Sequence, residues 1–392
     1  MVVGFAASIL NALLKVSRFV SAHIFLLRKY LRFILFALLA ILILWWFGRG
    51  LDWAQVKNSI EAADGRLLVA AIIIVCVTYW LRAKRWQALL APLAQASLRE
   101  LFVATTIGFS GLFLFGRAGE ILRPLVLPLR EPRVSPGASF VTIGVERIYD
   151  MVAVVVLFSV NLLVFRPPAE RAGDFTHIRF AGFTLLVGCI IGVCCLVLFR
   201  LYSEAMIDWL DKRFTAWRFV PERIGRGIVG LLKQLALSLG VLTNGRALFV
   251  TIGWTCVLWF AIASANLLVL RAFGLEFGFS ETIFMMGWSL VASLVPTPGG
   301  GAGAFHAATA AALVLLGVEK NQAAATVLIL NPIVFAPALI FGLYYLLRGD
   351  ISIRRIKQLV FSGEAERRVV EEEKQLDETN RGAEKLNLAA RG

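Results

Sequence analysis

Six long apolar runs, most of them free of charged side chains, limit what this 392-residue chain can fold into. A helix needs about 20 consecutive apolar residues to cross the hydrocarbon core of a bilayer. Hydrophobic residues make up 59% of the chain and charged residues 17%, against about 45–50% and about 25% in soluble domains. This excess excludes a soluble enzyme. We predict an all-α polytopic membrane protein with spans at 33–47, 67–81, 137–165, 180–199, 247–270 and 323–347.

Two further apolar regions, 100–129 and 281–317, are interrupted in the middle by glycine and proline. In lipid, a helix break is tolerated only inside protein or beside a wet cavity, because unpaired backbone amides are costly there. Breaks at corresponding places of two halves indicate a transporter-type binding site. The predicted fold has about six full transmembrane helices and two broken or re-entrant helical hairpins. They form two inverted-repeat-like halves, 33–200 and 247–349.

The surplus of positive charge, +14 in all, lies beside the apolar runs, because the tail from Asp350 onward is neutral. Basic residues on the cytoplasmic side orient membrane helices. The N-terminal arm and the stretch with Arg82, Lys84, Arg85 and Arg99 are therefore placed inside, and the balanced loop 48–66 outside. We predict a multi-pass protein of a prokaryotic plasma (inner) membrane, with both termini cytoplasmic and anionic lipids at that face. The pattern does not suit a nucleic-acid-binding protein.

Three polar segments flank or join the parts of the transmembrane domain 33–349. Residues 1–32 are predicted to form a basic amphipathic helix on the membrane surface. Residues 201–246 carry two apolar stripes and are predicted to be an amphipathic cytoplasmic connector, of interfacial helices or of helices packed under the bundle. Residues 350–392 are charge-rich and aromatic-poor, which is typical of a solvated helix or a disordered tail.

Ionisable residues gather at the first break and in the span that follows it. They are Arg117, Glu120 and Arg123 at three-residue spacing, and then Glu146, Arg147 and Asp150. Ionisable groups within a membrane are expensive and face a partner or an aqueous cavity. Glu146 and Asp150 need a cation between them, which Arg147, Arg117 or Arg123 could supply. We predict that all six bind a ligand. The alternatives are a buried structural ion network and snorkelling of Arg123, with Arg130, to the cytoplasmic interface.

The second break is a run of glycines. Gly299, Gly300 and Gly303 precede His306, which stands in the first turn of a new helix. A half-helix that begins inside the membrane offers free N–H groups and a partial positive charge, which attract a phosphate or carboxylate. We predict that these residues, and Gly119 at the first break, contact the ligand. The alternative is that the glycines only permit close helix packing.

No catalytic, metal or cofactor site is predicted. The five cysteines lie in apolar runs without a C-x-x-C spacing, and the three histidines are scattered, so neither a disulfide framework nor a metal cluster is expected. The chain also has no G-x-x-x-x-G-K-[ST] motif for nucleotide binding. Driven transport would then depend on an ion gradient or on lipid supply.

Three motifs resemble those of a known family. G-R-A-G-E-I-L-R-P at 116–124 is similar to the G-x-G-E-x-x-R segment of the transmembrane domain of lysylphosphatidylglycerol synthases, which stand-alone flippase-like proteins share. V-E-R-I-Y-D at 145–150 and P-T-P-G-G-G-A-G-A-F-H at 296–306 resemble that family's E-R-x-x-D span and its Pro-Gly-Gly-x-Gly turn. The resemblance covers roughly residues 30–347. Many members carry a glutamate where this chain has His306.

The resemblance implies a lipid-handling domain. In the synthases this domain moves a modified phospholipid between leaflets, and a separate C-terminal domain performs aminoacyl transfer. Only about 45 residues follow the last span here, so aminoacyl-lipid synthesis is not expected. We expect a translocase (flippase) of a phospholipid or a lipid-linked headgroup. A membrane-embedded transferase acting on a lipid-linked sugar, a role associated with some archaeal members, and a small-solute or ion transporter are the alternatives; oligomerisation is left open.

Overall fold

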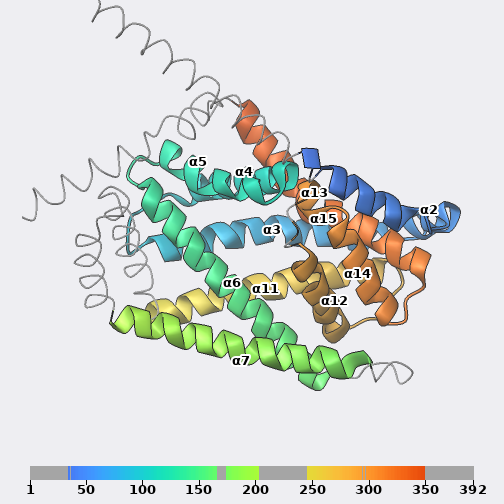
Figure 1. Ribbon diagram of the computed structural model, residues 1–392. Helices are drawn as coiled ribbons and strands as arrows, with labels where there is room; N and C mark the ends of the chain where they lie inside the picture. The colour runs from blue at the N-terminus through green and yellow to red at the C-terminus, as the bar shows by residue number, and fades with distance from the viewer. Residues whose placement is uncertain are drawn as a thin grey trace, which may run out of the picture.

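The structure is a computed structural model, which describes residues 34–35, 37–165, 174–202, 245–293, 295 and 297–348. Over these residues the protein is helical and has no strand (Figure 1). A first helix covers Ala37–Gly48. The others are α2 (Trp53–Glu61), α3 (Gly65–Leu90), α4 (Leu98–Phe115), the 3-10 helix η1 (Gly116–Ile121), α5 (Leu122–Arg130), α6 (Pro136–Val164), α7 (Asp174–Leu201), α11 (Gly245–Ala272), α12 (Phe279–Ala292), α13 (Pro298–Gly301), α14 (Ala304–Leu315) and α15 (Lys320–Leu347).

Six helices in the described part are long and apolar enough to cross a membrane, namely α3, α4, α6, α7, α11 and α15. This confirms the predicted all-α polytopic fold. The predicted run 67–81 ends too early, because α3 continues to Leu90. Arg82, Lys84 and Arg85, which we place after this span and on the cytoplasmic side from the sequence, belong to the helix itself.

The first predicted span, 33–47, leads into a sharp bend. Its described helix, Ala37–Gly48, meets α2 at 91°, and the two pass for a membrane span only as a pair. The predicted outside loop 48–66 therefore contains a helix. Asp52 caps α2 by accepting a hydrogen bond from the N–H of Ala54 at 3.0 Å, and Val56 is the buried residue of α2, which packs against α15. One of the six candidate spans is α4, which has 18 residues. From the sequence we predict this segment as one arm of a broken region.

The bundle is organised around α3 and α15. The first lies along α11, and the second crosses α4 and α2 (Figure 1). Apolar side chains from α3, α11, α12, α14 and α15 form the main core, with Phe284, Leu313 and Val327 fully buried. In contrast α7 lies at the periphery beside α6 (Figure 1). Most of its described side chains are exposed, as expected of a helix that faces lipid.

Both broken regions fold as helical hairpins. In the first, α4 and α5 pack together and η1 joins them, beginning at Gly116 with a φ of +62°. Such a φ favours glycine. At the end of the hairpin away from the break, an ion pair between Glu100 and Arg130 joins the start of α4 to the end of α5. In the second, α12 and α14 pack together around α13, where Gly299 and Gly300 have φ values of +74° and +66°.

The two breaks meet, because α13 contacts both α4 and η1. Whether the hairpins are re-entrant, and whether the two halves are related by inversion, stay predictions. The predicted arm 1–32, nearly all of the connector 201–246 and the tail 350–392 lie outside the described residues.

Candidate functional site

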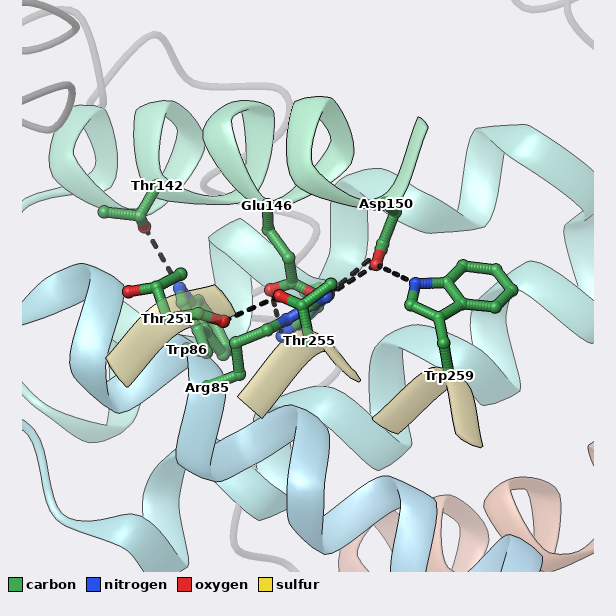
Figure 2. A network of polar contacts seen from close by, with 9 residues as sticks. Arg85, Trp86, Thr142, Glu146, Asp150, Thr251, Thr255 and Trp259 are labelled. Carbon is green, nitrogen blue, oxygen red and sulfur yellow. Dashed lines mark hydrogen bonds and ion pairs between the residues drawn. The ribbon is translucent and has the colours of Figure 1, made fainter. Parts of the chain in front are cut away.

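A cluster of buried charges lies where α3, α5, α6 and α11 converge. Ser135 caps the start of α6, and Pro136 occupies its first turn, where a missing N–H does no harm. From there the helical spacing of four places Glu146 and Asp150 on one face. Both residues are buried, Glu146 completely. Figure 2 shows them pointing toward side chains of α3 and α11.

Arg85 of α3 supplies the cation between these two carboxylates. Its Nη1 donates to Asp150 Oδ1 at 2.6 Å, and its Nη2 donates to Asp150 Oδ2 and to Glu146 Oε1, both at 3.0 Å (Figure 2). Arg85 is wholly buried. The indole nitrogen of Trp259 on α11 donates to Asp150 Oδ1 at 3.3 Å. Arg85 and Asp150 therefore form a bidentate ion pair, which is a strong arrangement of an arginine with a carboxylate.

Arg123 of α5 pairs with the other side of Glu146. Its Nη1 lies 2.9 Å from Oε1 and its Nη2 2.8 Å from Oε2. The guanidinium also lies 4.2 Å from the ring centre of Trp86, whose indole nitrogen donates to Thr142 Oγ1 at 3.0 Å. Gly108 makes room for Arg123, since a Cβ there would come within 2.6 Å of the arginine Cβ. The helix packing thus builds Arg123 into the cluster.

The cluster confirms that Glu146 and Asp150 need a cation and corrects which residue provides it. Arg85, together with Arg123, takes the role that we assign from the sequence to Arg147, Arg117 or Arg123. The side chain of Arg117 lies outside the described residues. Arg85 could not be picked out from the sequence because it stands among other basic residues that directly follow an apolar run. The apolar spacing of Leu81, Leu89 and Leu90, all buried on α3, is the signal that the helix continues.

Glu120 and Arg147 occupy a different position, at a small cleft beside the first break. Arg123 also lines this cleft, with Gly108, Phe109, Leu112 and Ile143. Its volume is about 10 Å³, room for about one water molecule. The Nε of Arg147 is buried and has no hydrogen-bond partner among the described residues. Three of the predicted residues therefore meet at the cleft, and Arg123 joins it to the ion network.

The predicted glycines pack tightly against other elements. A Cβ on Gly119 would lie 1.9 Å from the carbonyl oxygen of Gly111, and one on Gly300 would lie 2.3 Å from the ring of Phe335. Gly303, with a φ of +87°, faces the first helix. Close packing, the alternative reading, accounts for these three positions, and a ligand contact there stays a prediction.

His306 lies beside the glycine run in the first turn of α14. It is 7% exposed, its ring is 6.4 Å from that of Phe47, and its Nδ1 has no hydrogen-bond partner in the described part of the chain. Nearby, the side-chain amide of Asn331 donates to the carbonyl of Gly299 at 3.4 Å. The histidine therefore keeps an unused polar atom next to the second break.

An apolar groove of about 380 Å³ opens between α6, α11 and α12. Its walls include Phe158, Phe260, Met286 and Trp259. The same Trp259 donates its indole N–H to Asp150 (Figure 2), so one side chain joins the groove to the charge cluster. Among the described residues, no group of three or more His, Cys, Asp or Glu side chains could hold a metal ion.

Residues 32–342 match the family model described as "Lysylphosphatidylglycerol synthase TM region". The chain belongs to this family. Within the lysylphosphatidylglycerol synthase transmembrane family, it resembles UPF0104 membrane protein PH1989 of Pyrococcus horikoshii, at 22% identity over 82% of this chain and 97% of that protein. It also resembles "Glycosyltransferase AglD" of Haloferax volcanii, at 23% identity over 72% of this chain.

The family match covers both hairpins and every residue of the charge cluster. It leaves out most of the predicted N-terminal arm and the whole of the predicted tail. The chain covers 48% of AglD, so about half of that relative has no counterpart in the matched region.

Proposed function

We propose that this protein is a translocase that moves a phospholipid or a lipid-linked headgroup between the leaflets of a membrane. The observation that carries the proposal is the charge-lined cleft beside the first helix break, which the second break contacts, inside a bundle of apolar spans. Ionisable side chains are costly inside a membrane, so they pair with one another or mark a path for a substrate, an ion or a proton. Membership in a lipid-associated family gives further support.

The residues divide the work in this proposal. Arg85, Glu146 and Asp150 hold α3 and α6 in register, since their charges are already paired. Glu120 and Arg147 meet the headgroup at the cleft. The acyl chains remain in the lipid phase, and the apolar groove beside Trp259 gives a chain a surface close to the cluster.

The cleft is much smaller than any lipid headgroup, so binding requires it to widen. The hairpin of α4 and α5 forms one wall, and α6 forms the other. Movement of the hairpin relative to α6 would open the cleft, in turn, to each side of the membrane. We therefore assign the present arrangement to a closed state of an alternating-exposure cycle.

A vesicle assay tests the proposal. Purified protein is reconstituted into liposomes with a fluorescent phospholipid, and dithionite bleaching reports the lipid that reaches the outer leaflet. Wild type should raise the translocation rate, and Glu120→Gln or Arg147→Gln should lower it at least tenfold. Lys57→Gln, which removes an exposed pair with Glu61, is the matched control and should act like wild type. Variants as fast as wild type would remove the cleft from the mechanism.

A membrane-embedded transferase is the second candidate, favoured by the similarity to a protein named as a glycosyltransferase. Mass spectrometry of the vesicle lipids separates the two functions. A translocase leaves the mass of each lipid unchanged, whereas a transferase adds a group to its acceptor. A solute transporter, the third candidate, would carry a labelled solute or ion across vesicles without moving lipid.

The proposal includes a topology and a setting. Both termini lie in the cytoplasm of a prokaryotic cell, and anionic lipids neutralise the basic residues at that face. Reporter fusions at each terminus, active only on one side of the plasma membrane, test this orientation. Active fusions on the outer side would reverse it.

A further inference from the structure

The described side chains around the cluster carry more positive than negative charge. The guanidinium groups belong to Arg82, Arg85, Arg123 and Arg147, and the carboxylates to Glu120, Glu146 and Asp150. Arg82 lies within electrostatic range of Arg85, Arg147, Glu146 and Asp150. Four arginines against three carboxylates leave a formal charge of +1, even with Glu120 ionised. In an apolar bundle, such a surplus calls for an anion.

Two of the four arginines, Arg82 and Arg147, account for this surplus of positive charge because the other two are paired. Arg85 and Arg123 are paired with Glu146 and Asp150. No carboxylate in the described part of the chain lies within ion-pair distance of Arg82 or Arg147.

Of the two arginines without a carboxylate partner, Arg147 lines the cleft and Arg82 contacts an aromatic side chain that lines it. Arg147 lines it directly, and its Nε is buried with no hydrogen-bond partner there. The guanidinium of Arg82 lies 4.8 Å from the ring centre of Phe109, and Phe109 lines the same cleft. A cation near an aromatic ring gains about 0.5–2 kcal/mol, which is less than the cost of about 2.5–3.5 kcal/mol for an arginine at the centre of a membrane helix. The ring therefore does not replace an anion.

We infer that Arg82 and Arg147 form a binding site for one phosphate group and that Glu120 sets the charge this site prefers. Guanidinium groups bind phosphate oxygens through charge-assisted hydrogen bonds. With Glu120 ionised, the surplus of +1 matches a phosphodiester, which carries one negative charge. A phosphomonoester or a pyrophosphate would bring excess negative charge beside Glu120. This inference rests on the proposed function and narrows its substrate class.

Binding to the full-length protein in detergent tests the site. Isothermal titration calorimetry compares a six-carbon phosphatidylglycerol, the matching phosphatidic acid, farnesyl pyrophosphate and inorganic phosphate. Wild type should bind the phosphodiester lipid most tightly. Arg82→Gln and Arg147→Gln should each weaken it at least tenfold, because each removes a charged donor. Glu120→Gln should shift the preference toward the pyrophosphate.

Two controls separate a lost site from a lost fold. Lys84→Gln changes a neighbouring cation on α3 that lies against Trp80 instead of the cluster, and it should bind like wild type. Arg82→Gln and Arg147→Gln should also unfold no earlier than wild type, because they remove charges without carboxylate partners. Arg147→Lys keeps the charge and should retain part of the affinity.

Several results would overturn the inference. The first is equal affinity of wild type and both arginine variants for the phosphodiester lipid. The second is a Glu120→Gln variant that keeps the lipid preference of wild type. The third is inorganic phosphate that binds as tightly as the lipid, which would make the ligand a free anion. These failures are distinct from failure of the proposed function. If the arginine variants bind normally while vesicles still move lipid, only the site is wrong. If binding follows the prediction and no lipid moves, only the translocase is wrong.

Discussion

Replacing Arg85 by methionine should destabilise the protein strongly, because this one side chain pairs with two buried carboxylates. Its contacts with Asp150 are 2.6 and 3.0 Å, and its contact with Glu146 is 3.0 Å. Without Arg85, Glu146 keeps Arg123, but among the described residues Asp150 keeps only the hydrogen bond from the N–H of Trp259. A buried carboxylate would then lack a directly paired cation.

The size of the effect follows from the geometry. Two unit charges 4 Å apart attract by about 4 kcal/mol at an effective dielectric constant of about 20. Removing one partner of a buried pair costs about 3–5 kcal/mol, whereas removing both is often nearly neutral. Arg85→Met should therefore cost about 3–5 kcal/mol. The double variant Arg85→Met/Asp150→Asn should recover most of this lost stability, which corresponds to a coupling free energy of about 3 kcal/mol between the two residues.

Equilibrium unfolding in mixed micelles with rising mole fractions of SDS measures these free energies, with tryptophan fluorescence as the signal. Lys57→Met is the control, because it breaks an exposed pair with Glu61 at 3.6 Å, and exposed pairs contribute little. The reasoning is refuted if Arg85→Met is as mild as the control. It is equally refuted if the double variant loses the sum of the two single losses.

Three further substitutions, two of them with a matched glycine control, test the packing and the hydrogen bonding with the same unfolding assay. Gly119→Ala should cost several kcal/mol because its Cβ would lie 1.9 Å from a carbonyl oxygen, whereas Gly144→Ala meets nothing within 4 Å and should be neutral or slightly stabilising. Gly300→Ala should lower the free energy of unfolding more than Gly274→Ala does. Both glycines have a positive φ, which costs an alanine about 1–2 kcal/mol of strain. A Cβ on Gly300 would also lie 2.3 Å from an aromatic ring, whereas a Cβ on Gly274 would meet nothing within 4 Å. Trp259→Phe removes the N–H donor 3.3 Å from a carboxylate and should cost about 1 kcal/mol. Equal losses within either glycine pair, or no loss in Trp259→Phe, would contradict the packing described here.

The sequence located most spans to within a few residues because lipid exposure demands an unbroken apolar run. It also identified Glu146 and Asp150 as a pair that needs a cation, since helical spacing alone places them on one face. It could not identify Arg85, which comes from α3, 61 residues before Glu146. Three-dimensional packing decides which of several nearby arginines fills that place.

The glycines show a second limit of sequence reasoning. A glycine-rich break suits a ligand site and a close helix contact equally well. Only the positions of Gly111 and Phe335 reveal that Gly119 and Gly300 are needed for packing. Conversely, the separation of Arg147 from the ion network depends on the arrangement of α5 and α6, which no local pattern encodes.

The proposed function requires that lipid headgroups enter the cleft between the first break and α6. A cryo-electron microscopy map of the protein in nanodiscs that contain phosphodiester lipids tests it most directly. We expect density for a phosphate group within hydrogen-bond distance of Arg147, with its lipid tail in the bilayer. Density for lipid only around the outer face of α7, with the cleft sealed in every class of particle, would contradict it.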